Sequence, residues 1–306
     1  MKKRLLVVYY SQTGQIGSVI NTILSPLRND ETLEITTVRL ESREDFSFPW
    51  SFWRFFDVFP ETVHLDVPKN LPFKIMDPDK YDLIILGYQP WFLAPSMPMS
   101  AFLLSDEAKM ILNNKPIITV IGCRNMWIEA QKTMKNLIKD CGGRLIDNVV
   151  LKDQSGPLES FITTPRWMLT GKKEPFFGFS RVGISDSDIA QSVRFGERLV
   201  EKIRLNAHLE SAPLLSNLGA VCVDDRFIVS EKIGKRSFRI WGRIIRLFGK
   251  RGSRLRLPIV SFYILFLMTL ILTIVPINMT VQAILRRLFK GKVDRIREIL
   301  EAPSGR

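Results

Sequence analysis

The chain has 306 residues, of which 46% are apolar, and a formal net charge of +13. This length predicts about two domains, and the apolar fraction suffices for a sizeable core. The three cysteines lack metal-ligand spacing and there are only two histidines, so the sequence predicts no metal site. Reduced thiols in a cytoplasmic compartment fit this composition best.

Five segments predict β-strands, and helical patterns separate them. The first strand, 4–10, is a continuous apolar run, which is typical of a parallel strand buried on both faces. The other four strands are expected at 33–40, 81–88, 116–122 and 144–151. Helices are expected at 15–27, 100–113, 126–141 and 189–203. Strands that alternate with helices predict an α/β fold, a doubly wound parallel five-stranded sheet with helices on both faces.

Two segments interrupt this pattern and are interpreted as insertions, at about 42–66 and 152–184. In the first of them, eight of the fourteen residues 46–59 are aromatic, and no helix or strand period accounts for them. This segment is either a lid that binds lipid or hydrophobic packing for an enlarged domain.

The sequence divides into a domain at 1–207 and a basic tail at 208–306. Between Arg226 and Arg256 there are eleven basic residues and one acid, Glu231, directly before an apolar run. That order favours lipid headgroups over nucleic acid as the partner. The apolar segment 257–275 would span roughly 28 Å as a helix, which is close to the hydrocarbon thickness of a bilayer. The tail is therefore predicted to be helical, membrane-associated and bound to anionic lipids.

The path of the tail through the membrane has two alternatives. A single span would put the second basic flank outside, against the positive-inside rule. A hairpin bent at Pro276–Asn278 keeps both flanks on the cytoplasmic face of the inner membrane, and the sequence favours it slightly. Upstream, Trp241, Ile244, Ile245 and Phe248 form one apolar face of a basic helix suited to a membrane surface. We also expect the first domain to stay folded without residues 226–306.

A donor-rich turn follows the first strand and precedes the first helix. Ser11, Thr13 and Gly14 would offer hydroxyl and backbone N–H groups to a phosphate at a helix N-terminus. The alternative is a plain turn that caps the helix.

This turn resembles the phosphate loop of flavodoxins and flavodoxin-like quinone reductases, a Ser/Thr-x-Thr-Gly-x-Thr motif. Ser11, Thr13 and Gly14 match the motif, whereas Ile16 stands where the last Thr would be. The resemblance implies FMN bound at the carboxyl ends of the strands, a rule for which flavodoxin is itself the type example. It assigns cofactor contacts to three loops: Ser11, Gln12, Thr13, Gly14, Gln15 and Ile16; Gln89, Pro90, Trp91 and Phe92; and Gly122, Cys123, Arg124, Asn125 and Trp127.

Residues of the last two loops match the needs of a flavin ring. Trp91 and Trp127 would form an aromatic platform, and Asn125 a polar contact. Arg124 would either stabilise a reduced flavin anion or form a surface salt bridge. Cys123 is read as a small core residue rather than a redox group. No acid–base residue is assigned.

A narrower resemblance is to proteins labelled dialkylresorcinol condensing enzymes. It rests on the start Tyr-Tyr-Ser-Gln-Thr-Gly, the Phe-Pro-Trp segment, Tyr-Gln-Pro-Trp-Phe-Leu and Arg-Asn-Met-Trp. It implies a membrane-associated FMN-dependent oxidoreductase that acts on a lipid-like or quinone-like ring and oxidises a dialkylcyclohexanedione, made by a partner ketosynthase, to a dialkylresorcinol. The alternatives are a flavin-free scaffold protein of a membrane lipid or pigment complex and a flavodoxin-type electron carrier.

Overall fold

The core of the molecule is a parallel sheet with the strand order β2-β1-β3-β6-β7. The computed structural model describes residues 2–73, 75, 77–156, 159–205 and 213–304, with the side chains of 274–280 and 283–286 excepted. The five strands are β1 (Lys3–Tyr9), β2 (Leu33–Arg39), β3 (Leu83–Tyr88), β6 (Pro116–Cys123) and β7 (Arg144–Lys152). All neighbouring pairs are parallel, for example with Val7 opposite Thr37 on one side and Ile85 on the other. This is the flavodoxin-like doubly wound order, and the predicted fold class is confirmed.

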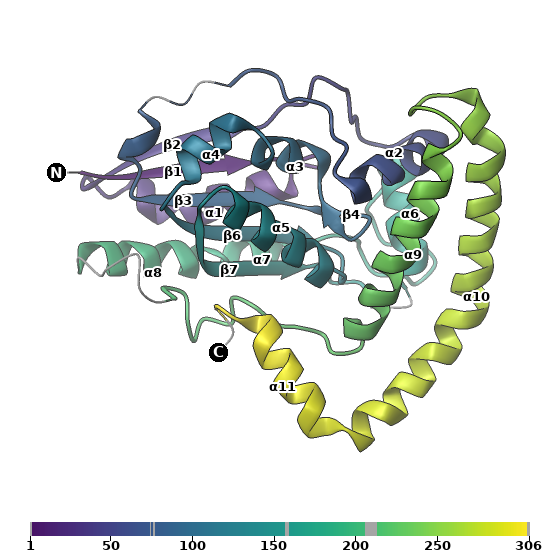
Figure 1. The fold of residues 1–306 in the computed structure, drawn as a ribbon. Helices are drawn as coiled ribbons and strands as arrows, with labels where there is room; N and C mark the ends of the chain where they lie inside the picture. Colours follow the sequence, from purple (N-terminus) through teal and green to yellow (C-terminus); the bar gives the residue numbers. More distant parts are fainter. Residues whose placement is uncertain (1, 74, 76, 157–158, 206–212, 305–306) are drawn as a thin grey trace.

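Helices cover both faces of the sheet (Figure 1). One face carries α1 (Gln15–Arg28), α7 (Asp186–Gln191) and α8 (Val193–Arg204), and the other carries α3 (Met97–Leu103), α4 (Asp106–Leu112) and α5 (Ile128–Asp140). The single helix expected at 100–113 is two helices, because the side chain of Ser105 accepts a hydrogen bond from the N–H of Ala108 and starts a new helix. Gly196 brings α8 against α1, since a Cβ there would lie 1.9 Å from the carbonyl oxygen of Ile23.

Both predicted insertions contain helices. The aromatic segment forms α2 (Phe52–His64), and the second insertion forms α6 (Ser160–Thr170). The expectation that no helical period orders the aromatic segment is wrong. Phe52, Phe55, Phe56, Phe59 and Val63 follow the i, i+3, i+4, i+7, i+11 spacing of one helix face.

The C-terminal third contacts the sheet domain at several places. The N–H groups of Leu214 and Leu215 donate to the buried carboxylate of Asp147, at 2.6 and 3.2 Å. Helix α9 (Ile228–Arg246) lies against α2, and α10 (Leu257–Leu288) and α11 (Lys290–Glu301) lead back to the sheet edge (Figure 1). There the fully buried Ser304 donates to Asp147 at 2.6 Å.

Two expectations for the tail are therefore wrong. The chain does not reverse at Pro276–Asn278, because α10 continues through them; a proline removes one helical hydrogen bond and can kink a helix, but it need not turn the chain back. The predicted membrane-facing stripe of α9 is partly used inside the protein. Ile245 is fully buried, and the Trp241 ring packs 5.3 Å from Tyr263 of α10, whereas Phe248 is exposed.

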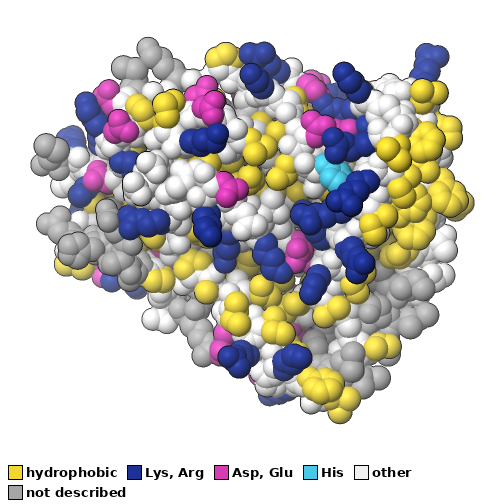
Figure 2. Space-filling view, viewed as in Figure 1, with side chains coloured by type: hydrophobic (Ala, Val, Ile, Leu, Met, Phe, Trp, Pro, Cys, Tyr) yellow, Lys and Arg dark blue, Asp and Glu magenta, His cyan; other side chains and the backbone are white. Residues whose placement is uncertain are grey.

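One helix in the described part of the chain is long and apolar enough to cross a membrane. It covers Arg254–Thr273 with a mean hydropathy of 2.2, and only 17% of the window is buried in the protein. Figure 2 shows hydrophobic side chains at the edge of the molecule where α10 lies, and Lys and Arg side chains beside them.

Candidate functional site

The turn after β1 has the geometry of an anion-binding loop. Gly14 has φ +88°, a left-handed conformation that favours glycine, and it precedes the first residue of α1. The hydroxyl of Ser11 is buried under the loop and accepts from the N–H of Gly17 at 3.1 Å. Among the described residues, none accepts a hydrogen bond from the N–H groups of residues 13–16. Four unpaired donors at a helix N-terminus suit a phosphate.

Ile16 has a packing role that explains its departure from the motif. Its side chain is 2% exposed and lies over two strands that carry glycine beneath it. A Cβ on Gly122 would come 2.6 Å from Ile16 Cδ1, and one on Gly87 would come 3.2 Å from Ile16 Cγ2. Ile16 thus fixes the loop to β3 and β6 by contact, where the motif would have a hydroxyl.

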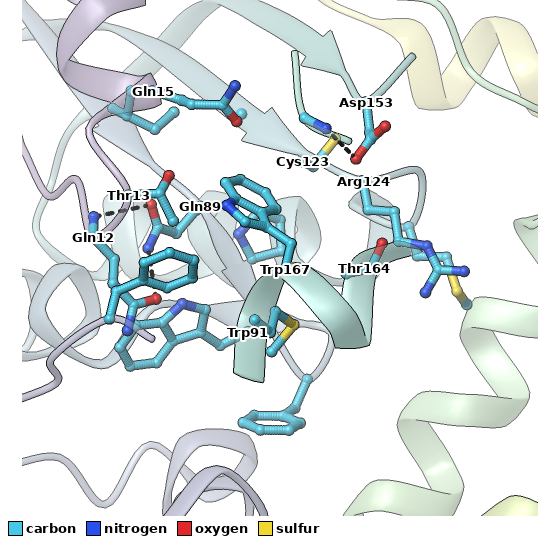
Figure 3. A pocket seen from close by; sticks show the side chains of 18 of the residues that line it. Gln12, Thr13, Gln15, Gln89, Trp91, Cys123, Arg124, Asp153, Thr164 and Trp167 are labelled. Atoms are coloured by element: carbon cyan, nitrogen blue, oxygen red, sulfur yellow. Dashed lines mark hydrogen bonds between the residues drawn. The ribbon is translucent and has the colours of Figure 1, made fainter. Parts of the chain in front are cut away.

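A cavity of about 380 Å³ extends from this loop across the carboxyl ends of β3, β6 and β7 (Figure 3). Its size is within the range of about 300–1,000 Å³ usual for ligand pockets. Eleven of the fifteen predicted site residues line it: Gln12, Thr13, Gln15, Ile16, Gln89, Pro90, Trp91, Phe92, Gly122, Cys123 and Arg124. Ser11, Gly14, Asn125 and Trp127 are not among its lining residues. The three predicted loops therefore meet in one space.

The aromatic platform differs from the predicted one. Trp91 lines the cavity and packs edge-on against Tyr10 and Trp50, which hold its ring. Trp127 is 1% exposed and lies in the core, because its backbone N–H is drawn inward to a buried carboxylate of α9. Its assignment to the cofactor is therefore corrected. Trp167 of α6 extends into the cavity instead (Figure 3).

Polar groups also line the cavity where β6 ends and on α6. The guanidinium of Arg124 lies 4.8 Å from the centre of the Phe161 ring, and burial lowers the pKa of Arg124 to about 10, against an opposing effect of Asp153. The hydroxyl of Thr164 is buried and has no hydrogen-bond partner among the residues that the structure describes, and Thr164 lines the cavity. A buried hydroxyl without a partner is costly, so this atom is suited to a ligand.

Cys123 and Asp153, which also line the cavity, have structural roles. The thiol of Cys123 points to the carbonyl oxygen of Leu151 at 3.7 Å, and burial raises its pKa, so that it stays protonated and weakly nucleophilic. The carboxylate of Asp153 accepts from the N–H groups of Ser155 and Gly183, both at 2.7 Å. It thereby folds the second insertion over the cavity.

Helix α9 holds two of the three loops from outside the sheet domain. The carboxylate of Glu231 accepts from the N–H groups of Trp127 and Glu129, at 3.1 and 2.9 Å. One turn later the ammonium of Lys235 donates to the carbonyl oxygen of Leu93 at 2.7 Å. Gly234, just before Lys235, and Phe238, about one turn after it, line the cavity. The wall of the site is thus completed by the segment that the sequence assigned to the tail.

The turn that Lys235 holds is strained. Strands β4 (Pro90–Trp91) and β5 (Ala94–Pro95) form a hairpin whose two turn residues, Phe92 and Leu93, have φ +49° and +59°. Bulky residues adopt this conformation at a cost of about 1–3 kcal/mol each. Packing of the Phe92 ring against Phe55, 4.8 Å between centres, helps to hold it.

Glu231 makes the stability of the protein depend on pH. Burial raises its pKa to about 8 from an ordinary value of 4.5, so the folded state holds this proton more tightly than the unfolded state does. Its stabilising contribution is complete below pH 4.5 and is lost as the pH rises to 8. One pKa unit is about 1.4 kcal/mol. As the pH rises from 5 to 8, we therefore expect the free energy of unfolding of the wild type to fall by several kcal/mol more than that of Glu231→Gln.

Urea unfolding at both pH values measures this difference. Glu197→Gln, on the exposed side of α8, is the control, and its free energy of unfolding should equal that of the wild type at both pH values. If the free energy of unfolding of E231Q changes between pH 5 and pH 8 as that of the wild type does, Glu231 is already ionised in the folded protein at pH 5.

Sequence reasoning missed Trp167, Thr164, Asp153, Glu231 and Lys235. A signal existed for Glu231, since it is the only acid in a run of eleven basic residues. For the two residues of α6 there was none, because an insertion has no fixed place relative to the sheet.

Comparison with known proteins adds structural neighbours. No protein-family model and no curated protein matches the chain. A flavoprotein from Lactobacillus acidophilus, solved in complex with FMN, aligns with a TM-score of 0.40 and 18% identity over 48% of this chain and 93% of its own. Flavodoxin 1 from Bacillus cereus aligns with a TM-score of 0.36 and 16% identity, over 65% of this chain and 98% of its own. A Fusobacterium nucleatum flavodoxin mutant bound to flavin mononucleotide aligns with a TM-score of 0.35 and 11% identity, over 67% of this chain and 98% of its own. The neighbours are flavodoxins and flavoproteins.

Proposed function

We propose that this protein is an FMN-dependent oxidoreductase that acts on a lipid-like or quinone-like ring. The observation that carries the proposal is one continuous cavity that joins four unpaired backbone donors at the start of α1 to an aromatic and cationic wall. The unpartnered hydroxyl of Thr164 in that wall supports the same reading.

The residues divide the binding work along the cavity. The N–H groups of residues 13–16 would hold the FMN phosphate, with Gln15 fixed in place by its bonds to Ile184. Trp91 and Trp167 would enclose the ring, and Arg124 would place a positive charge near it, which favours a reduced, anionic ring. When bound, FMN supplies a group that accepts or gives up a hydride. Helices α2, α6 and α9 limit the access of water.

An enzyme fits this arrangement better than an electron carrier does. A carrier needs an exposed ring edge, whereas three segments outside the sheet, carrying Phe48, Trp50, Trp167 and Phe238, cover this cavity. The apolar lining suits a hydrophobic substrate. From the resemblance described above, the reaction would be the two-electron oxidation of a dialkylcyclohexanedione to a dialkylresorcinol, with a ketosynthase as partner. A flavin-free scaffold is the remaining alternative.

Association with the cytoplasmic face of the cell membrane is part of this proposal. Its support is the exposed apolar helix at Arg254–Thr273 and the basic residues before it. An anionic membrane would be the second partner, beside a substrate that is itself soluble in lipid.

Titration with FMN tests the cofactor assignment. Because a stacked indole quenches flavin emission, adding the wild-type protein to FMN should quench its fluorescence, and Trp167→Ala should restore much of the emission while the protein still binds. Trp53→Ala, which removes an exposed indole on α2 outside the cavity, is the control and should quench as the wild type does. Absence of quenching with excess FMN would leave the scaffold alternative.

A further inference from the structure

Helix α10 presents an apolar surface that no other described segment of the chain covers. Its exposed large side chains, those 42–75% exposed among the described ones, are Leu257, Phe262, Leu265, Met268, Leu272, Val281 and Leu288. No charged residue occurs from Leu257 to Leu285. A continuous exposed apolar surface of this kind marks an interaction site.

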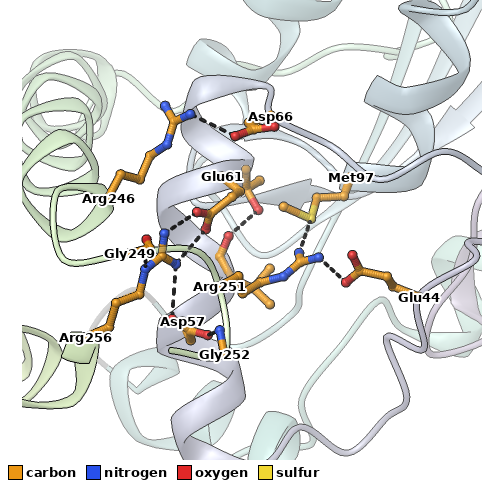
Figure 4. A network of polar contacts seen from close by, with 12 residues as sticks. Glu44, Asp57, Glu61, Asp66, Met97, Arg246, Gly249, Arg251, Gly252 and Arg256 are labelled. Carbon is orange, nitrogen blue, oxygen red and sulfur yellow. Dashed lines mark hydrogen bonds and ion pairs between the residues drawn. The ribbon is translucent and has the colours of Figure 1, made fainter. Parts of the chain in front are cut away.

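The same helix is tied to the sheet domain at both of its ends. At the start, the guanidinium of Arg256 is bound by the carboxylates of Glu61 and Asp57 from α2 (Figure 4). In the next turns the ring of Tyr263 stacks on Phe59 of α2, 4.6 Å apart and 29° between planes. Toward the other end the amide of Gln282 donates to Ser230 of α9 at 3.2 Å. Helix α11 then returns the chain to Asp147.

This tethering decides between two orientations in a membrane. The 32 residues of α10 extend about 48 Å at 1.5 Å per residue. A helix that crosses a bilayer has its ends on opposite sides, whereas both ends of α10 contact the same domain. The apolar surface can therefore enter a bilayer without unfolding these contacts only if the helix lies along its surface.

The exposed side of α9 supplies matching charge beside this helix. Lys232, Arg236, Arg239 and Arg243 are exposed, while the one acid of α9, Glu231, is fully buried. Figure 2 shows Lys and Arg side chains next to the hydrophobic edge of the molecule. A basic row along an apolar surface complements the headgroups and the outer acyl region of an anionic leaflet.

We propose that α9 and α10 form a docking face for one leaflet of an anionic membrane, with α10 lying in the plane of the interface rather than spanning it. This deepens the proposed membrane association and is independent of FMN binding. The docking face adjoins the wall of the candidate site, because the buried Phe59, which stacks on Tyr263 of α10, also contacts the cavity residue Phe92 at 5.7 Å between rings. A substrate in the leaflet would thus be separated from the cavity by this one cluster of packed rings.

Depth measurements along α10 distinguish the two orientations. Single cysteines at Leu257, Leu265 and Leu272, in full-length protein with the three native cysteines replaced by serine, carry an NBD fluorophore. The vesicles contain phosphatidylglycerol and phosphatidylcholine with quenchers at shallow or deep acyl carbons. Leu265 is about 12 Å along the axis from Leu257, and about 10 Å from Leu272, on a helix that rises 1.5 Å per residue. Docking in the plane predicts equal, shallow depth for all three. A spanning helix predicts Leu265 deep and the other two shallow, which would overturn the proposal.

Variants without a label test the face independently. The double variant Leu265→Glu/Leu272→Glu should lose vesicle binding, whereas Met110→Glu, which changes an exposed methionine on α4, should keep it. Arg236→Glu/Arg243→Glu should weaken binding to anionic vesicles at least about ten-fold. Urea unfolding of each variant checks that the fold is intact. Failure of the wild type to bind vesicles would overturn the proposal, as would a dimer in solution that L265E/L272E converts to a monomer.

Discussion

Replacing Thr13 by glutamate should expel FMN from the protein. Thr13 lines the cavity at the centre of the phosphate loop, between Gln12 and the left-handed Gly14. A carboxylate there would lie close to the phosphate. Two unit charges 4 Å apart repel by about 4 kcal/mol at the effective dielectric constant of a protein surface, so we expect FMN affinity to fall by about 10²–10³-fold.

The measurement is the dissociation constant of FMN from fluorescence quenching, together with urea unfolding of the apoprotein. Asn21→Glu is the matched control, because it adds the same charge on the exposed side of α1, eight residues from Thr13. It should bind FMN as the wild type does. A T13E variant with wild-type affinity and unchanged stability would show that the phosphate is bound elsewhere.

Replacing Arg256 by methionine should be the most destabilising single change at the junction of α2 and α10. The Arg256 side chain is 2% exposed, and its nitrogens lie 2.5 Å from Glu61 and 3.2 Å from Asp57 (Figure 4). Removing one partner of a buried ion pair leaves an uncompensated charge and typically costs 3–5 kcal/mol. We expect the free energy of unfolding to fall by about that amount.

Arg246→Met is the matched control, since it breaks an exposed pair with Asp66 in the same region. Exposed pairs contribute about 0–1 kcal/mol, so this variant should unfold almost as the wild type does. The double variant Arg256→Met/Glu61→Leu should recover part of the loss, because it removes both buried charges. Equal denaturation midpoints for R256M and R246M would contradict the buried network.

The sheet could be predicted from the sequence because its signals are local. Five apolar runs separated by helical periods define a parallel sheet, and Gly14 marks the loop after the first strand whatever the rest of the chain does. The alternation does not depend on distant contacts, and the three loops at the carboxyl ends meet because parallel strands all point the same way. That is why eleven predicted residues share one cavity.

The rest depended on long-range contacts that have no local pattern. Trp127 follows a strand that ends at the site, yet Glu231, more than one hundred residues later, draws its backbone into the core. Charge counting alone placed α9 at a membrane, whereas its inner side, with Gly234 and Lys235, faces the cavity and the Leu93 turn. That residues 1–225 fold alone stays a prediction, and the same long-range contacts show what the truncated domain would lose. Without α9 and Ser304, the carboxylate of Asp147 loses one partner and the N–H groups of Trp127 and Glu129 lose theirs.

The order of these contacts along the chain has a consequence for biogenesis. A ribosome would release the whole sheet, the phosphate loop and α6 before α9 has been synthesised. Domains generally fold as their residues emerge, so a nascent chain would already have two of the cavity walls while the side closed by Gly234 and Phe238 stays open. Cofactor binding would then be completed late, once Glu231 and Lys235 of α9 form their hydrogen bonds with the loops. The apolar α10 emerges directly afterwards, so loading with flavin and arrival at the lipid surface would fall in the same short interval of synthesis.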